Sequence, residues 1–485
     1  RVAKKLLSEN YVRLDVQPRT NLRPSTHTLD RTVMPTGQRA GRFQPPAPSR
    51  KKLKNGLTVM HLERQGLPLV SFGLMVKSGA IADPEATPGL THLTTTLLQE
   101  GTSGRSSQDI SGALESLGTH LDTDVSREHI LLSMDLLAAN WTKALGLLGE
   151  IVTDPAFPQK ELERVRKQRL TDLKRVTDDP TAIAMRASRA LLYGADHPYG
   201  HPVSGTERSV AAVSREDVVA HYKRLFTPDD ATFIVVGPVS MDEAVKQAEA
   251  AFGSWKRSRK GAENNHVAVG EQPGATTIYL ADKRGAAQSV IYAGQVTIPR
   301  HHADFYAMNL LNLVLGGQFS ARLNMNLRQD KGYSYGYMSG IDWLRGPSAF
   351  LAGGAVQTRV TKEAVIETLA ELRDIHGKRP VTSQEFENAR QGVFRGFASA
   401  FETQSQILHQ MARMALFDLP DTYFQEYVSN LEKVKLQDVR RVAKEELSKG
   451  PTVLLVVGDM GEVESGLREL EINTEIVDYE GRVTS

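Results

Sequence analysis

Cysteine is absent from all 485 residues of the sequence. Structural disulfides and thiolate metal sites are therefore excluded, and the absence fits an extracytoplasmic protein that avoids mispaired thiols. Long hydrophobic runs are also missing: none approaches the roughly 20 residues that span a bilayer, so we expect no transmembrane segment. Neither sign of charge dominates, because the formal net charge is only +2, and this balance gives no indication of a nucleic-acid partner.

The chain repeats one short plan three times, in which a helix ending in a Leu-Ser or Phe-Thr step is followed by an apolar strand. The three helices are Arg1–Ser8, Val218–Thr227 and Arg441–Ser448, and the first and third agree at six of eight positions. Self-similarity of this kind indicates repeated domains, for which a chain of 485 residues has room. The alternative is chance similarity between amphipathic helices.

The repeats predict the domain boundaries, together with two polar stretches that are expected to be linkers at the surface. The first linker contains six prolines and is rich in Lys and Arg. A fragment of a repeat at the N-terminus would make this chain a processed or truncated piece of a longer polypeptide. The predicted organisation is the tail of a preceding repeat at 1–16, a Pro/Arg-rich linker at 17–54, a first repeat at 50–257, a linker at 258–275, a second repeat at 276–470 and a C-terminal tail at 471–485.

Strand pairs mixed with long helices predict an α+β fold in both repeats. The expected architecture is two tandem homologous α/β-sandwich repeats. In the first repeat, residues 57–63 and 69–77 are predicted to pair as a hairpin, and residues 119–136 are predicted to form another. Thr87 and Pro88 are predicted to open the helix between these hairpins, as its N-cap and its first residue.

That helix carries one residue of a three-residue metal-binding motif. Inverted zincins use His-x-x-Glu-His, in which two histidines one turn apart hold zinc and the Glu activates the bound water. Here the first histidine is His92, but Thr95 stands at the position of the Glu and Thr96 at that of the second histidine. Either the segment is not this motif, or the chain descends from a peptidase and no longer cuts by itself.

Further landmarks stand in a fixed order along the chain. They are Leu53–Val59, Gly89–His92, His197–Pro202, the Val-Val-Gly endings at 235–237 and 456–458, and Leu327–Tyr335. With these landmarks the chain resembles the insulinase/pitrilysin-type zinc metallopeptidases, in the branch that includes mitochondrial processing peptidases and bacterial relatives. The resemblance covers residues 1–470 and implies the half-clamshell fold of that family.

The resemblance also implies a third zinc ligand on a later helix, where this chain has Asp172, 76 residues after Thr96. The ligand set would then be His92, Thr96 and Asp172, with Thr95 in place of the base. A neutral Thr hydroxyl is a poor zinc ligand, and its pKa does not suit general base catalysis. We therefore expect these four positions to be vestigial, with no metal or other cofactor in this chain and zinc in a partner half.

For the second repeat, the resemblance implies a working pair formed by Arg328 and Tyr335. In the family, the half opposite the zinc supplies an Arg and a Tyr with this spacing. An Arg offers a fixed fork of donors to a peptide carbonyl or carboxylate, and a Tyr hydroxyl can donate to the oxyanion that forms at the scissile carbonyl. The alternative, from residue types alone, is a surface charge and a strand aromatic.

These features predict the non-zinc half of a two-part zinc metalloendopeptidase, inactive alone, which closes the chamber over a peptide substrate. Its partner would be the zinc-bearing half, either upstream in the same precursor or a separate subunit of a heterodimer. The alternative function is a catalytically inactive scaffold or peptide-binding protein of the same fold. The missing cysteines and the composition of the linker favour the periplasm, or another extracytoplasmic compartment, over a mitochondrial matrix.

Overall fold

The computed structural model describes residues 14–15, 43–257, 275–448 and 450–484. The chain divides into two parts, of which the first ends at Arg42 and the second begins at Phe43. Most of the repeat tail predicted at 1–16 and most of both predicted linkers lie outside the described residues. Within the described ranges, no helix combines the length and the apolar composition that crossing a bilayer requires.

The first sheet has six strands in the order β1-β2-β6-β3-β5-β4. They are β1 (Ser49–Lys52), β2 (Thr58–Glu63), β3 (Leu69–Val76), β4 (Asp122–Val125), β5 (Ile130–Leu137) and β6 (Ala231–Gly237). The predicted hairpin at 119–136 is confirmed by the antiparallel pair β4–β5. The predicted hairpin of 57–63 with 69–77 is wrong, because β6 lies between β2 and β3 and pairs with both. Every residue of β6 is buried, as is usual for a central strand covered on both faces.

In the described residues, eight α-helices accompany the first sheet, and short 3-10 turns stand between several of the elements. The helices are α2 (Leu90–Leu97), α3 (Ser107–Ser116), α4 (Trp141–Thr153), α5 (Gln159–Val176), α6 (Pro180–Tyr193), α7 (Glu207–Ala212), α8 (Arg215–Leu225) and α9 (Met241–Phe252). The 3-10 turns are η1 (Ala80–Ala82), η2 (Leu98–Glu100), η3 (Ala138–Asn140) and η4 (Pro228–Asp230). Apolar residues of α2, α4 and α9 share one core with the inward face of the sheet.

The second sheet has the order β12-β7-β11-β8-β10-β9. Its strands are β7 (Thr277–Asp282), β8 (Gln288–Thr297), β9 (Met338–Asp342), β10 (Ser348–Gln357), β11 (Val453–Gly458) and β12 (Thr474–Ile476). Strand β11 lies in the middle of this sheet, parallel to β7 and antiparallel to β8. In the first sheet β6 has the same arrangement between β2 and β3. The α+β fold built from two alike α/β layers is thereby confirmed, while the exact domain boundaries stay a prediction.

The second sheet has its own set of helices. They are α10 (Phe305–Leu315), α11 (Arg322–Asn324), the π-helix η5 (Met325–Asp330), α12 (Thr361–Asp374), α13 (Ser383–Phe397), α14 (Gln404–Leu416), α15 (Tyr423–Lys433), α16 (Leu436–Leu447) and α17 (Met460–Arg468), with 3-10 turns η6 (Thr358–Val360) and η7 (Ala398–Phe401). Helices α10, α12 and α16 pack with this sheet in a second core.

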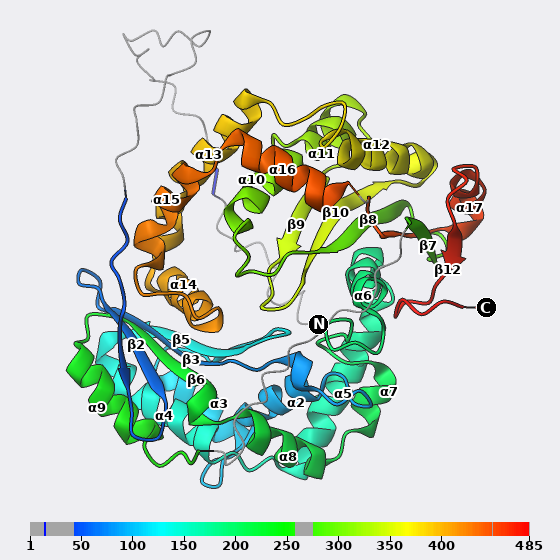
Figure 1. The fold of residues 1–485 in the computed structure, drawn as a ribbon. Coiled ribbons are helices and arrows are strands. Elements are labelled where there is room, and N and C mark those ends of the chain that lie inside the picture. The colour runs from blue at the N-terminus through cyan, green and yellow to red at the C-terminus, as the bar shows by residue number, and fades with distance from the viewer. Residues whose placement is uncertain (1–13, 16–42, 258–274, 449, 485) are drawn as a thin grey trace. The chain divides into compact units, whose positions relative to one another are not determined.

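Each sheet is also covered by a helix that the other half of the sequence supplies (Figure 1). On the first sheet, Met60 and Ile234 pack with Met411 of α14. On the second sheet, Leu455 packs with Ile183 of α6. Each sheet therefore has apolar residues on both faces, and the two halves bury one face of each sheet only by exchanging helices. Separating the halves would expose both of these apolar faces to water.

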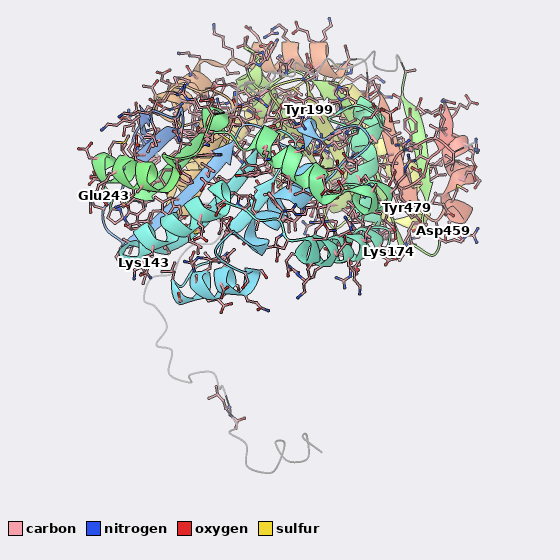
Figure 2. All side chains as sticks on the ribbon, turned by 90° about the horizontal axis from the view of Figure 1, so that it is seen from below. Lys143, Lys174, Tyr199, Glu243, Asp459 and Tyr479 are labelled. Carbon is pink, nitrogen blue, oxygen red and sulfur yellow. The ribbon has the colours of Figure 1, made fainter. Side chains whose placement is uncertain are left out.

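Polar contacts reinforce this joint beside the turn between β4 and β5. The buried Glu128 of that turn accepts hydrogen bonds from the hydroxyl of Tyr199, at 2.6 Å, and from the backbone N–H of Arg345, at 2.8 Å. Tyr199, which Figure 2 labels, belongs to the His-Pro-Tyr landmark, and its side chain is buried. Glu128 and Tyr199 belong to the first half of the chain, and Arg345 lies on the turn between β9 and β10 of the second half. These bonds therefore connect the two halves.

Candidate functional site

The helix of the degenerate metal motif is positioned by a side chain from outside it. Helix α2 begins at Leu90, and Gly89 before it takes a left-handed conformation with φ of 89°. The predicted N-cap at Thr87 is therefore wrong. Instead, the buried carboxylate of Asp83 accepts hydrogen bonds from the backbone N–H groups of Gly89 and Thr91, each at 2.7 Å. Asp83 satisfies the free N–H groups of the first turn and so fixes where α2 starts.

His92 faces helix α5, where it meets a cation. The Nη2 nitrogen of Arg169 lies 2.9 Å from both ring nitrogens of His92. Burial, and after it the positive charge of Arg169, lower the pKa of His92 from 6.5 to about 4. The imidazole is therefore neutral near pH 7, and one of its nitrogens can accept a hydrogen bond from the guanidinium.

The two threonines of the motif use their hydroxyls inside their own helix. Thr95 is fully buried and donates to the carbonyl oxygen of Thr91 at 2.8 Å. Thr96 donates to the carbonyl oxygen of His92 at 2.9 Å. Such bonds back to the preceding turn are common for threonine in helices. They direct both hydroxyl hydrogens to the backbone, so neither side chain is arranged to serve the chemistry of a base.

The residues at this site do not fit a zinc ion. The position predicted as third ligand, Asp172, lies close enough to Arg169 to raise the pKa of that guanidinium, against the larger lowering caused by burial. The site thus already holds one positive charge between His92 and Asp172. No group of three His, Asp or Glu side chains arranged for a metal occurs among the described residues, and catalytic zinc uses three protein ligands.

The second predicted pair lies on and just after the π-helix η5. The guanidinium of Arg328 stands over the ring of Phe319, 4.7 Å from its centroid. No carboxylate of the described residues forms an ion pair with Arg328, whose side chain is exposed. Tyr335 is 89% exposed and Phe319 is 62% exposed. Two exposed aromatic residues on the segment that carries an unpaired guanidinium are typical of a surface that binds another molecule.

The backbone around Tyr335 is anchored on both sides, so the position of its Cα is fixed. Before it, the hydroxyl of the buried Ser334 donates to the carbonyl oxygen of Ala355 at 2.7 Å. After it, the fully buried Tyr337 shares a hydrogen bond of 2.7 Å with Thr368. These anchors leave Tyr335 as the residue that projects outward from the segment.

A second set of bonds ties this segment to η5. The carbonyl oxygen of Leu327, which is buried next to Arg328, accepts from the backbone N–H of Tyr333 at 2.8 Å. The spacing of Arg328 and Tyr335 is thus maintained by backbone bonds rather than by contact between the two side chains. A π-helix is rare and frequently marks a functional site.

The structure groups the predicted residues into two separate sets. His92, Thr95 and Thr96 lie together on α2, and Asp172 lies on α5 beside Arg169. No hydrogen bond or ion pair of the described residues connects this set to the pair on η5. The functions predicted for the individual residues remain predictions, since position alone does not establish them.

Arg169 is the residue of this site that the sequence prediction missed. It stands three positions before Asp172 on α5, so both side chains lie on one face of the helix. That spacing was visible in the sequence as Arg-Leu-Thr-Asp. This arginine, one turn from the predicted ligand position, is the signal in the sequence for a cation that can reach His92.

Two protein-family models match this chain. The model of the insulinase family, peptidase family M16, matches residues 59–207, and the model described as the peptidase M16 inactive domain matches residues 212–393. The first match therefore includes α2 with its degenerate motif, and the second includes η5 and the segment with Tyr335.

Relatives and solved structures agree with these matches. A protein of Bacillus subtilis named an uncharacterized zinc protease is 24% identical over 396 residues, which are 81% of this chain and 94% of that protein. A protein of Mycobacterium leprae with the same description is 25% identical over 400 residues, covering 82% and 89%. The crystal structure of a peptidase M16 inactive domain from Pseudomonas fluorescens has a TM-score of 0.78 at 21% identity, covering 85% of this chain and 97% of that one. A protease from Helicobacter pylori has a TM-score of 0.79 at 20% identity, covering 85% and 100%.

Proposed function

Because this chain belongs to the insulinase family of peptidases, we propose that it works as the non-zinc half of a two-part zinc metalloendopeptidase. In this proposal Arg328 and Tyr335 contact the peptide substrate, and a partner half holds the zinc that activates the attacking water. The observation that carries the proposal is the contrast between the two sites. On the motif helix, His92 is occupied by its contact with Arg169. Arg328 and Tyr335, in contrast, present free hydrogen-bond donors at the surface.

Each residue of the exposed pair has a role that its chemistry suits. The guanidinium of Arg328 is steadied over Phe319 and keeps its hydrogens available for a carbonyl or carboxylate of the substrate. The hydroxyl of Tyr335 can donate to the oxyanion that develops when the scissile carbonyl is attacked. Because its ring is 89% exposed, a second molecule can reach it without a change in the fold.

The test is a reconstituted complex of this chain with its zinc-bearing half. Tyr335→Phe removes only the hydroxyl and should lower kcat about a hundredfold, as the loss of one oxyanion donor does. Arg328→Ala should lower kcat/KM without releasing the partner in gel filtration. Arg284→Ala is the matched control, because Arg284 is an exposed arginine on the turn between β7 and β8. Unchanged turnover in an intact complex would support the inactive scaffold instead.

Two further measurements address the partner and the metal. We propose that the partner is either the preceding part of one precursor or a separate subunit of a heterodimer, and the mass of the protein purified from its own cells distinguishes the two. The isolated chain should contain no stoichiometric zinc by elemental analysis. One zinc per chain would contradict the division of labour proposed here.

The compartment is part of the same proposal. We place the complex in the periplasm or another extracytoplasmic space, in keeping with a sequence that has no cysteine. Fractionation of the source cells, with an antibody against this chain, checks this placement. Recovery with cytoplasmic markers alone would overturn it.

A further inference from the structure

A cavity of about 930 Å³ lies between the two halves of the chain, and residues of both halves line it. Its wall is formed by the turn between β4 and β5, by the end of β9, and by α10, α13, α14 and α15. Cavities of roughly 300–1,000 Å³ are the usual size of ligand pockets. We propose that this cavity binds the carboxylate end of a short peptide, with Arg300 as the residue that recognises the carboxylate. The proposal does not depend on the function proposed above.

Arg300 is held in the cavity wall by aromatic rings. Its guanidinium stands over Phe305, 3.5 Å from the ring centroid, and lies 5.3 Å from that of Tyr423 and 5.6 Å from that of Phe417. Its Nη2 donates to the hydroxyl of Tyr423 at 2.5 Å. The residue is only 8% exposed. The aromatic cage therefore fixes the guanidinium in position before any ligand arrives.

The charge of Arg300 has no acidic partner among the described residues. Among the described residues, the hydrogen bond of Nη2 to Tyr423 is the one that its guanidinium forms, so Nε and Nη1 are left without an acceptor there. A buried charge without a counter-ion is costly, and an arginine is best matched by a carboxylate that accepts two parallel hydrogen bonds. The free N–H groups of Arg300 therefore favour a ligand that carries a carboxylate.

The carboxylates that line the cavity are already engaged elsewhere. Glu128 accepts from Tyr199 and from the backbone N–H of Arg345. Asp342 pairs with Arg189, at 3.2 Å, and with Arg127, at 3.7 Å. Three arginines and two carboxylates line the cavity in all, so its wall carries a positive excess. This excess favours an anionic ligand.

The rest of the wall indicates that the ligand has both an apolar body and polar backbone groups. Phe397 and Tyr427 stack at a centroid distance of 5.2 Å on one side, which suits an apolar side chain. Asn309 also lines the cavity, and its Oδ1 accepts from the indole N–H of Trp343 at 3.1 Å, which leaves its amide N–H₂ for a ligand carbonyl. A peptide end with an apolar last residue combines a carboxylate, an apolar side chain and such carbonyls.

The experiment is titration calorimetry of the intact chain with N-acetyl-Ala-Ala-Phe, with its C-terminal amide, and with laurate. The free acid should bind, and the amide should bind at least tenfold more weakly because it cannot pair with the guanidinium. Equal binding of acid and amide, or no binding of the acid, would overturn the proposal. Binding of laurate without binding of the peptide would overturn the assignment to a peptide.

Variants locate the binding site. Arg300→Gln should abolish binding of the acid, and Arg300→Lys should weaken it, because a lysine keeps the charge but not the fork of donors. Arg284→Gln, on an exposed turn, is the matched control and should bind as the wild type does. If Arg300→Gln fails to fold, Tyr423→Phe provides the second test, since it leaves the guanidinium in place and should preserve the preference for acid over amide. Undiminished binding by a folded Arg300→Gln protein would refute the role of Arg300.

Discussion

Acidification should destabilise this protein through His92, and the structure allows the size of the effect to be worked out. Burial and Arg169 lower the pKa of His92 from 6.5 to about 4. Between these two pH values the unfolded chain binds a proton at His92 and the folded chain does not. Stability therefore falls as the pH drops through this window, and the contribution levels off once the folded state is protonated as well.

The magnitude follows from the two pKa values. One pKa unit corresponds to about 1.4 kcal/mol, and only part of the window lies between pH 7 and pH 5. Over that interval His92 alone should remove about 2 kcal/mol from the free energy of unfolding. The variant His92→Gln keeps an acceptor for Arg169 but cannot titrate, so its loss over the same interval should be smaller than that of the wild type by this amount.

Two assays check the reasoning. Urea unfolding at pH 7 and pH 5 compares the wild type with His92→Gln, and with His120→Gln, which removes an exposed histidine as the matched control. Carbon–proton NMR of the histidine rings gives the pKa directly, because the resonance of His92 is the one missing from its variant. A resonance of His92 that titrates near 6.5, or equal pH dependence of all three proteins, would refute the argument.

Three other predictions concern the motif helix and the second sheet. Restoring the motif with Thr95→Glu and Thr96→His should not produce stoichiometric zinc binding while Arg169 remains, whereas adding Arg169→Ala should increase zinc affinity measurably in calorimetry. Asp83→Ala should destabilise the fold by at least about 2 kcal/mol in urea unfolding, because it leaves buried N–H groups of α2 without acceptors. Gly353→Ala should prevent normal folding or cost more than about 3 kcal/mol, since its Cβ would lie 1.9 Å from a backbone carbonyl oxygen of the neighbouring strand; normal stability by thermal unfolding would contradict this.

Local pairing was predictable from the sequence, and pairing over long distances was not. The hairpin at residues 119–136 was predicted correctly, because its two strands are neighbours in sequence and a short turn joins them. The strands at 57–63 and 69–77 have similar patterns and are also neighbours. They are nevertheless separated by β6, whose entry between them depends on apolar contacts with both faces of the sheet.

The exchange of α6 and α14 between the sheets could not be predicted either. Both are amphipathic helices, and an amphipathic pattern shows that one face is buried without showing what covers it. Met411 and Ile183 were therefore predictable as buried residues, but their partners on the sheet of the other half were not. The choice of partner depends on the tertiary arrangement of both halves.

The degenerate motif shows the same limit at the level of single residues. Residue identity at three positions, His92, Thr95 and Thr96, was enough to predict that the helix lacks the base and the second ligand of a zinc protease. It was also enough, with the landmarks, to identify the family. These conclusions need only the order of residues along one chain, because a missing imidazole or carboxylate is missing in every conformation.

What fills the vacated site depended on tertiary structure. Arg169 reaches His92 from a different helix, and two of the three rings around the guanidinium of Arg300, Phe417 and Tyr423, come from a distant part of the sequence. The burial and the hydrogen bonds of His92 and Arg300 depend on residues that are distant in sequence, so they form only when the chain folds. The sequence alone indicates which chemistry has been lost, and the fold decides what replaces it.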